Sequence, residues 1–250
     1  MYTENPNDEQ KLHLIIDKTV KHFQEYNDRR SQLAVDDAPF FSLAWLTMEE
    51  NSYLWLGGCR PSLSIRLVYS LCGSELDSQL SEFLQGVRTC NVGELSADQL
   101  GLVSDLQCST VREEVKLSSK MVSLQERIVD DPLIVLAKSI SNGNLICSND
   151  SGGTAADQST NRQEVDQALA SHAKDLASIL VEADELRLNT LKELIGILTP
   201  LQAVDFLIAS KKLHICIHQW GLRRDMQRER EEAANDGEPS PTLSTPSLPG

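Results

Sequence analysis

The chain has 250 residues, of which 40% are hydrophobic and 24% charged, as in ordinary folded globular proteins. Its formal net charge of −14 argues against non-specific binding to nucleic acid or anionic membranes, because neutralising phosphates requires clustered Lys and Arg. The longest apolar run near mid-chain, residues 133–137, is far shorter than the roughly 20 residues of a membrane span. The charged N-terminal segment contains no apolar block, so we expect an intracellular protein without a secretory signal.

The six cysteines are widely spaced, and no two of them form a C-x-x-C pair. In a chain of this size without a secretory signal, separate reduced thiols are the expected state. Neither a zinc site nor a disulfide framework is therefore predicted, and no residue is assigned as a metal ligand.

Hydrophobic residues recur at three- and four-residue steps along most of the chain, which predicts an all-α fold. The first helix covers residues 12–26, and a proline-containing stretch at residues 31–43 interrupts the pattern. Thr47 and Glu50 have the spacing of a capping box, which predicts a short helix that Gly57–Gly58 ends.

Three further helices are predicted in the first half of the chain. A proline at the first position opens a helix over residues 61–72, and another covers residues 76–87. Ser96 and Gln99 form a second capping box, which opens a long helix. That helix ends at Asp131, because the residue before a proline disfavours helical backbone.

The middle of the chain changes composition. A short helix is predicted over residues 136–140, and Gly, Ser, Asn, Asp and Thr then dominate residues 142–162, which predicts a flexible loop. A second long helix begins near Glu164 and continues to the next proline break.

A third capping box opens the last helix. Thr199 is the expected N-cap, Pro200 sits at the first helical position, and Gln202 completes the box. Residues 8–232 are therefore predicted to form one multi-helix domain with two long helices. The Pro/Ser/Thr-rich residues 233–250 are expected to be a disordered tail.

Three separated motifs resemble the signatures of one plant family. Residues 55–62, W-L-G-G-C-R-P-S, are similar to its W-[IL]-[AG]-G-x-R-P-[ST] pattern. Residues 198–207 resemble its L-T-P-x-Q-A-x-x-F-L pattern, and residues 213–221, L-H-I-C-I-H-Q-W-G, continue it. On these motifs the chain resembles the DELAY OF GERMINATION domain, which also forms the C-terminal half of TGA-type bZIP transcription factors. The resemblance extends from about residue 8 to residue 230.

The resemblance implies an all-helical, non-enzymatic regulator in seed dormancy, abscisic-acid or stress signalling and transcription regulation. Such a protein would act in the nucleus, the cytoplasm or both, through protein contacts. A type 2C protein phosphatase, a TGA-type factor or a second copy in a homodimer are the partners that it suggests. The basic leucine zipper of TGA factors has no counterpart in this sequence, so we expect no direct DNA binding by this chain alone.

His214 and His218 lie four residues apart and so share one face of the last helix. They resemble a histidine pair that links dormancy-regulator relatives to haem, which makes a sensor of haem or a small apolar ligand the alternative function. The other interpretation is two half-buried histidines packed beside Trp220. A lone H-x-x-x-H lacks the glutamate and third ligand of a zinc enzyme.

Two interpretations of the first motif remain open. A partner or ligand pocket could be formed by Trp55, Gly57, Gly58, Arg60 and Pro61, since paired glycines permit positive φ and close backbone approach. The alternative is a tight helix-to-helix turn with Trp55 in the core and Arg60 capping a neighbouring helix.

Residues 211–230 contain six basic and two acidic side chains, which makes this stretch of the last helix basic and amphipathic. With Trp220 as anchor, it predicts a surface for calmodulin or another acidic partner. The alternative is a solvated helix end whose positive charge suits the helix dipole.

Catalytic motifs are absent from the sequence, which contains no G-x-S-x-G, P-loop, G-x-G-x-x-G or H-E-x-x-H pattern. Adjacent acidic residues such as Glu113 and Glu114 point apart on a helix and are expected on a solvated face. The sequence therefore predicts a protein that is not an enzyme.

Overall fold

The computed structural model describes residues 6–36, 46–72, 95–130, 134 and 155–236. Within these ranges the chain is helical and forms no strand beyond one isolated bridge, which confirms the predicted all-α class. The helices are α1 (Pro6–Asp36), α2 (Met48–Ser52), α3 (Ser62–Cys72), α5 (Ala97–Asp130), α7 (Ala155–Ile197) and α8 (Pro200–Asp236).

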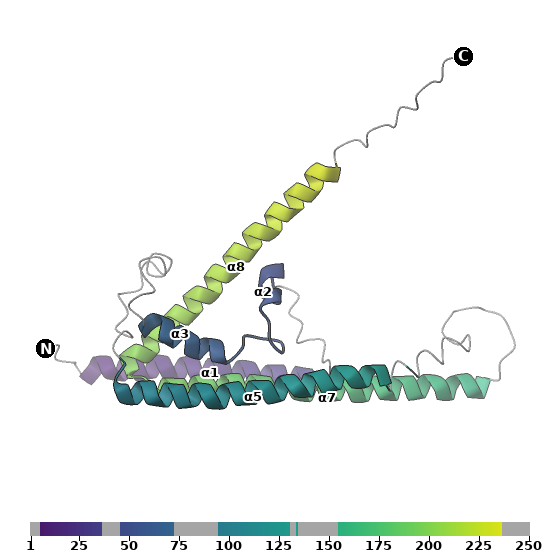
Figure 1. Cartoon of the computed structure of the whole chain (residues 1–250), viewed down its shortest axis with the longest axis horizontal. Helices are drawn as coiled ribbons and strands as arrows, with labels where there is room; N and C mark the ends of the chain where they lie inside the picture. The colour runs from purple at the N-terminus through teal and green to yellow at the C-terminus, as the bar shows by residue number, and fades with distance from the viewer. Residues whose placement is uncertain (1–5, 37–45, 73–94, 131–133, 135–154, 237–250) are drawn as a thin grey trace, which may run out of the picture.

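Three long helices form the body of the protein. α7 packs against both α5 and α1, and the three run side by side along the length of the bundle (Figure 1). α3 contacts α5, α7 and the beginning of α8. α8 then leaves the bundle at a steep angle, and the short α2 lies against its projecting part.

The main core lies where α3 and the first turns of α8 meet the three long helices. Ile65, Val68, Val103 and Leu194 are fully buried there, and Phe206 is 1% exposed. Burying one such side chain stabilises the fold by about 1.5–3 kcal/mol. The start of α8 is therefore fixed in the bundle, whereas its distal half depends on α2.

All three predicted capping boxes are confirmed. Thr47 N–H donates to Glu50 Oε2 at 2.9 Å, and Glu50 N–H donates to Thr47 Oγ1 at 3.2 Å. Ser96 and Gln99 exchange the equivalent bonds at 3.0 and 3.1 Å, which opens α5.

The box at the start of α8 joins that helix to α5. Thr199 and Gln202 exchange their capping bonds at 2.9 and 3.3 Å. Gln99 Nε2 also donates to Gln202 Oε1 at 3.0 Å and to the Ile197 carbonyl oxygen at 2.9 Å. Two helix starts far apart in the sequence are thus held together.

Helix bounds differ from the prediction at several places. α2 ends at Ser52 rather than at Gly57–Gly58, because residues 55–58 form a tight turn of their own, and α1 begins at Pro6 rather than near residue 12. α1 continues to Asp36 instead of breaking at residue 31, because Arg30 is anchored in the interior and good helix formers follow it. α7 begins at Ala155, so the end of the predicted 142–162 loop is helical; its first residues include Ala155, Ala156 and Gln158, which favour a helix. α8 reaches Asp236, beyond the predicted end at residue 232.

Other predictions lie outside the described residues. These are the helices at residues 76–87 and 136–140, the loop over residues 142–154 and the tail from residue 237. The four described cysteines are free thiols, as expected for separate cysteines. No described helix has the length and apolar character needed to cross a membrane.

Candidate functional site

The Trp55–Gly58 segment is a tight turn between α2 and α3. Trp55 N–H donates to the Gly58 carbonyl oxygen at 2.8 Å, and Gly58 N–H donates back to Trp55 at 3.2 Å. Leu56 has φ 45° and Gly57 φ 72°, the pair of positive φ values that a type I′ turn requires. Glycine accepts this conformation readily, whereas Leu56 costs of order 1–2 kcal/mol, so other contacts must hold the turn.

Two arginines hold the turn through its backbone carbonyl groups. Arg187 of α7 donates to the carbonyl oxygens of Trp55, of Leu56 at 2.9 Å and of Cys59 at 2.6 Å. Arg30 of α1 donates to the Gly57 carbonyl oxygen at 3.0 Å. Carbonyl groups in a turn lack helix or sheet partners, and these guanidinium groups satisfy them. We call this set the arginine clamp.

Asp184 joins the two arginines of the clamp. Its carboxylate lies 2.6 Å from Arg187 Nη1 and 3.1 Å from Arg30 Nε, and its side chain is 3% exposed. Burial raises the pKa of the Asp184 carboxyl, and the two guanidinium groups act in the opposite direction. An uncompensated buried charge is very costly, so each member of the clamp depends on the others.

The side chains of the first motif fit around the clamp. Trp55 is half-buried rather than enclosed in the core; it donates from Nε1 to Ser118 Oγ at 3.0 Å, and the Arg187 guanidinium lies 5.4 Å from its ring centroid. A Cβ at Gly58 would lie 2.9 Å from Arg187 Cζ. Glycine at position 58 is therefore required for close approach of the turn to the arginine.

Arg60 and Glu114 connect the turn to the start of α3. Glu114 of α5 is fully buried, accepts from Ser62 N–H at 2.7 Å and from Ser62 Oγ at 3.1 Å, and pairs with Arg60 Nε at 2.6 Å. A carboxylate at this place satisfies a free N–H group and favours the positive end of the α3 dipole. Pro61 is buried beside it.

These contacts correct two expectations. Arg60 does not cap a helix; it pairs with Glu114, whose carboxylate performs the capping. The solvated-face expectation holds for Glu113, which pairs with Lys116, but is wrong for Glu114.

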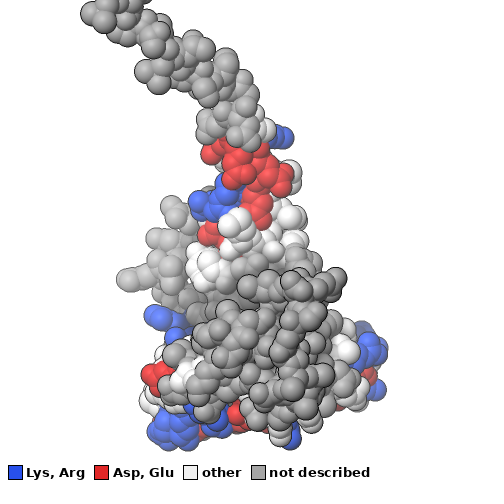
Figure 2. Space-filling view, turned by 90° about the vertical axis from the view of Figure 1, so that its right-hand side faces the viewer, with Lys and Arg blue, Asp and Glu red and all other residues white. Residues whose placement is uncertain are grey.

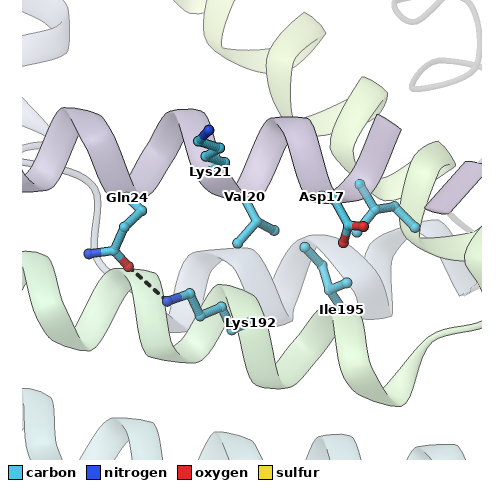
Figure 3. A pocket seen from close by; sticks show the side chains of 7 residues that line it. Asp17, Val20, Lys21, Gln24, Lys192 and Ile195 are labelled. Atoms are coloured by element: carbon cyan, nitrogen blue, oxygen red, sulfur yellow. Dashed lines mark hydrogen bonds between the residues drawn. The ribbon is translucent and has the colours of Figure 1, made fainter. Parts of the chain in front are cut away.

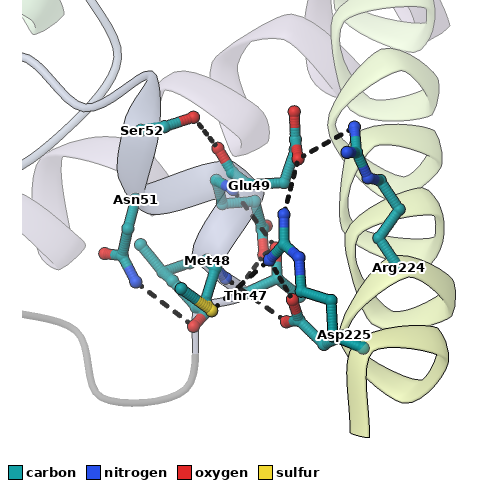
Figure 4. A network of polar contacts seen from close by, with 10 residues as sticks. Thr47, Met48, Glu49, Asn51, Ser52, Arg224 and Asp225 are labelled. Atoms are coloured by element: carbon teal, nitrogen blue, oxygen red, sulfur yellow. Dashed lines mark hydrogen bonds and ion pairs between the residues drawn. The ribbon is translucent and has the colours of Figure 1, made fainter. Parts of the chain in front are cut away.

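A second polar network fastens α2 to the projecting part of α8. Glu49 lies between Arg224 and Arg228, with closest N–O distances of 3.5 and 4.0 Å (Figure 4). Met48 N–H donates to Asp225 Oδ2 at 3.3 Å. We call this set of contacts between α2 and α8 the α2–α8 junction.

Glu50 and His218 form the inner part of the junction. His218 Nδ1 lies 2.8 Å from Glu50 Oε2, and Glu50 is 7% exposed. Burial favours a higher pKa for Glu50, but hydrogen bonds from His218 and Thr47 outweigh it, so the Glu50 pKa is lowered. A Cβ at Gly221 would lie 2.2 Å from Thr47 Oγ1, so only glycine permits this approach.

The histidine pair is divided by this network. His218 is held by Glu50, which leaves Nε2 as its remaining ring nitrogen, whereas His214 is exposed. Trp220 is 47% exposed, and the Arg224 guanidinium lies 4.9 Å from its ring centroid. Among the residues that the structure describes, no group of three or more His, Cys, Asp or Glu could hold a metal ion.

An open groove of about 380 Å³ runs between α1 and α7, away from all of these residues (Figure 3). Ile16, Val20 and Ile195 form its apolar floor. Lys192 on its rim donates to Gln24 Oε1 at 2.8 Å. None of the residues predicted for a site lines this groove.

The chain matches known proteins over most of its length. A family model described as DOG1, seed dormancy control, matches residues 2–70. The chain is 36% identical to Protein DOG1-like 3 of Arabidopsis thaliana over 231 residues, which cover 88% of this chain and 76% of that protein. It is 28% identical to Transcription factor TGA2 of Arabidopsis thaliana, over 79% of this chain and 50% of that protein.

A third relative is Protein RESPONSE TO ABA AND SALT 1 of Arabidopsis thaliana, 24% identical over 76% of this chain and 66% of that protein. These relatives carry the names of plant regulators, not of enzymes. The resemblance drawn from the three sequence motifs is confirmed. The chain belongs to the DOG1 family of seed dormancy control, with TGA factors as more distant relatives.

Proposed function

We propose that the chain regulates seed dormancy and abscisic-acid or stress responses, including transcription, by binding partner proteins in the nucleus or cytoplasm. A type 2C protein phosphatase is the partner class that we favour, with a TGA-type factor second. DNA contact in such complexes would come from the TGA-type factor, because the net charge of −14 on these 250 residues disfavours phosphate binding.

The observation that supports this proposal is the way one exposed segment is held. Met48 and Tyr53 are 66% and 64% exposed. The arginine clamp fixes the turn that follows them, and the α2–α8 junction fixes α2 itself. A segment whose backbone is already fixed loses less entropy on binding, so the exposed apolar side chains that it carries suit a protein interface.

The chemistry of the buried polar groups agrees with this role. Arg187 and Glu114 bind backbone groups of the chain itself, and neither of them lines the groove between α1 and α7. The groove between α1 and α7 is open and holds no pair of groups placed for acid–base chemistry. A binding surface therefore explains the arrangement better than a catalytic centre does.

The test is binding of a panel of purified type 2C phosphatases to the full chain. Tyr53→Ala and Met48→Ala should each weaken binding about tenfold, as expected for exposed anchor side chains. Val122→Ala, at a residue 51% exposed on α5, is the matched control and should leave binding unchanged. Equal binding by all variants would remove this surface from the proposal.

A second candidate function, haem sensing, is favoured by one contact. The 2.8 Å bond between His218 Nδ1 and Glu50 orients the ring and leaves Nε2 for a metal, an arrangement common in histidine ligands. His214 lacks such a partner among the described residues, so one axial ligand from His218 fits better than two. Both histidines project from one helix and would not bind opposite faces of one iron.

Haem titration of the full chain tests this candidate. His218→Ala should abolish a shift of the Soret band, His214→Ala should retain it, and helical circular dichroism should be unchanged because Ala favours helices. An identical Soret spectrum with wild type and His218→Ala would exclude His218 as the ligand.

A further inference from the structure

An apolar stripe follows the solvent side of α8. Four exposed side chains recur at intervals of seven residues, close to two helical turns, so they lie almost in line. Met226 extends the line toward the C-terminal end of the helix and is 50% exposed. The four are Leu201, Ile208, Ile215 and Leu222, between 39% and 52% exposed.

Basic side chains border this stripe on one side. At about 100° per residue, Lys212, Arg223 and Arg230 lie roughly 60–80° from Ile215 around the helix. Arg223 and Arg230 are exposed, and neither forms an ion pair or hydrogen bond with the described residues. Figure 2 shows uncharged surface beside Lys, Arg, Asp and Glu side chains on the projecting part of the chain.

The α2–α8 junction occupies a different side of the same helix. Gly221, Arg224 and Arg228 lie roughly 120–180° from Ile215. Arg224 pairs with Glu49, and Arg228 pairs with Glu49 and Asp225. The apolar stripe therefore stays accessible while α2 is in place. A partner that encloses the whole helix, as calmodulin does, would have to displace α2.

Trp220 does not belong to the stripe. It lies about 140° from Ile215, and Arg224 stacks on its ring. The anchor residues of this face are therefore the aliphatic side chains and Met226, which differs from the tryptophan-anchored surface expected from sequence.

We propose that the α8 stripe, with its border of Lys212, Arg223 and Arg230, binds an acidic amphipathic helix of a partner protein. An apolar face with residues at heptad spacing packs against one face of another helix, and the unpaired basic border selects acidic flanks. This surface is separate from the Met48–Tyr53 segment, so the two can be tested independently.

Charge argues against a second copy of this chain as the occupant. In antiparallel pairing centred between Ile215 and Leu222, each basic border faces the same border of the other helix. Lys212 would then lie beside Arg223 of the second copy, and like charges at such an interface oppose pairing. Parallel pairing would bring together the two bundles, which both lie at the N-terminal end of α8.

The probe is a synthetic helical peptide of about 25 residues, with Leu and Ile in heptad register and Glu on both flanks. Its affinity for the full chain is measured by fluorescence anisotropy. Ile215→Ser, Leu222→Ser and Arg223→Glu should each weaken binding about tenfold, and added salt should weaken it further. Circular dichroism verifies that each variant keeps its helical content.

Matched controls distinguish binding at this surface from non-specific binding of the peptide. Val122→Ser and Arg112→Glu change an exposed apolar and an exposed basic residue of α5 and should leave peptide affinity unchanged. A peptide of the same composition with its apolar residues dispersed around the helix should not bind. Equal binding of both peptides, or an equal loss in the α5 variants, would overturn the proposal.

Two further outcomes are decisive. Sedimentation that shows a dimer dissolved by Ile215→Ser would assign the stripe to a second copy and refute the acidic-helix proposal. Ile215→Ser should leave phosphatase binding unchanged, whereas Tyr53→Ala should leave peptide binding unchanged. Failure of one surface is thus distinguishable from failure of the other.

Discussion

Removing Arg187 should release the turn that carries the first sequence motif. Arg187→Ala deletes the hydrogen bonds to the Trp55, Leu56 and Cys59 carbonyl groups and one of the two cations that face Asp184. The Arg187 side chain is 16% exposed and that of Asp184 3%, so water replaces these partners poorly. The clamp therefore predicts a large loss of stability from one substitution.

The size of the loss follows from the contacts that remain. Breaking a buried ion pair by removing one partner costs about 3–5 kcal/mol. Arg30 still lies 3.1 Å from Asp184, so we expect the lower part of that range, about 3–4 kcal/mol. For a chain of this size that corresponds to a fall in Tm of roughly 6–16 °C.

Denaturant and thermal unfolding, followed by circular dichroism, measure this loss. Arg187→Lys retains the charge but not the planar group that reaches several carbonyl oxygens. Its free energy of unfolding should therefore fall between those of wild type and Arg187→Ala. Lys120→Ala is the matched control, because Lys120 of α5 also forms an ion pair with a carboxylate of α7, Glu182, but at the surface. The free energy of unfolding of that variant should fall by no more than about 1 kcal/mol. A similar small loss for Arg187→Ala would refute the clamp as a stabilising network.

Three other substitutions test the remaining buried polar contacts. Glu114→Gln should lower the free energy of unfolding by about 2–3 kcal/mol, since an amide replaces a carboxylate that only accepts; an unchanged Tm would contradict this. Gly221→Ala should loosen α2 from α8, because the new Cβ would lie 2.2 Å from Thr47 Oγ1; hydrogen exchange should rise in α2 and stay constant in the core. The lowered pKa of Glu50 implies a stabilising contribution that is present above its ordinary value of 4.5 and lost as pH falls through the folded value. Glu50→Gln should therefore reduce the loss of stability on acidification, and parallel stability–pH curves would argue against the bond to His218.

Local signals in the sequence were sufficient for the helical class and for the starts of α2, α5 and α8. Each capping box joins residues three positions apart, so its chemistry is complete within one turn and does not depend on the rest of the fold. The boxes at Thr47, Ser96 and Thr199 could be predicted for that reason. The three motifs at residues 55–62, 198–207 and 213–221 indicated the family on the same local basis.

The spacing of apolar residues in the sequence indicates that Asp184 and Glu114 occupy buried helix positions. Asp184 stands four residues from both Leu180 and Leu188, which are buried, so it occupies a core position of α7. Glu114 lies on the same side of α5 as Leu106 and Leu117.

The tertiary structure alone determined why these acids are buried and what they hold. Asp184 meets Arg30 from a distant helix, and Glu114 meets the first N–H group of α3. Tertiary contacts also distinguish the arginines of α8, which look alike in sequence. Arg224 pairs with Glu49 of α2, whereas Arg223 pairs with none of the described residues. Hydrophobic spacing is a property of one helix, whereas a buried charge is stable only where another element supplies its partner. The sequence therefore specified the helices, and the packing of those helices decided which charges became structure and which remained as surface.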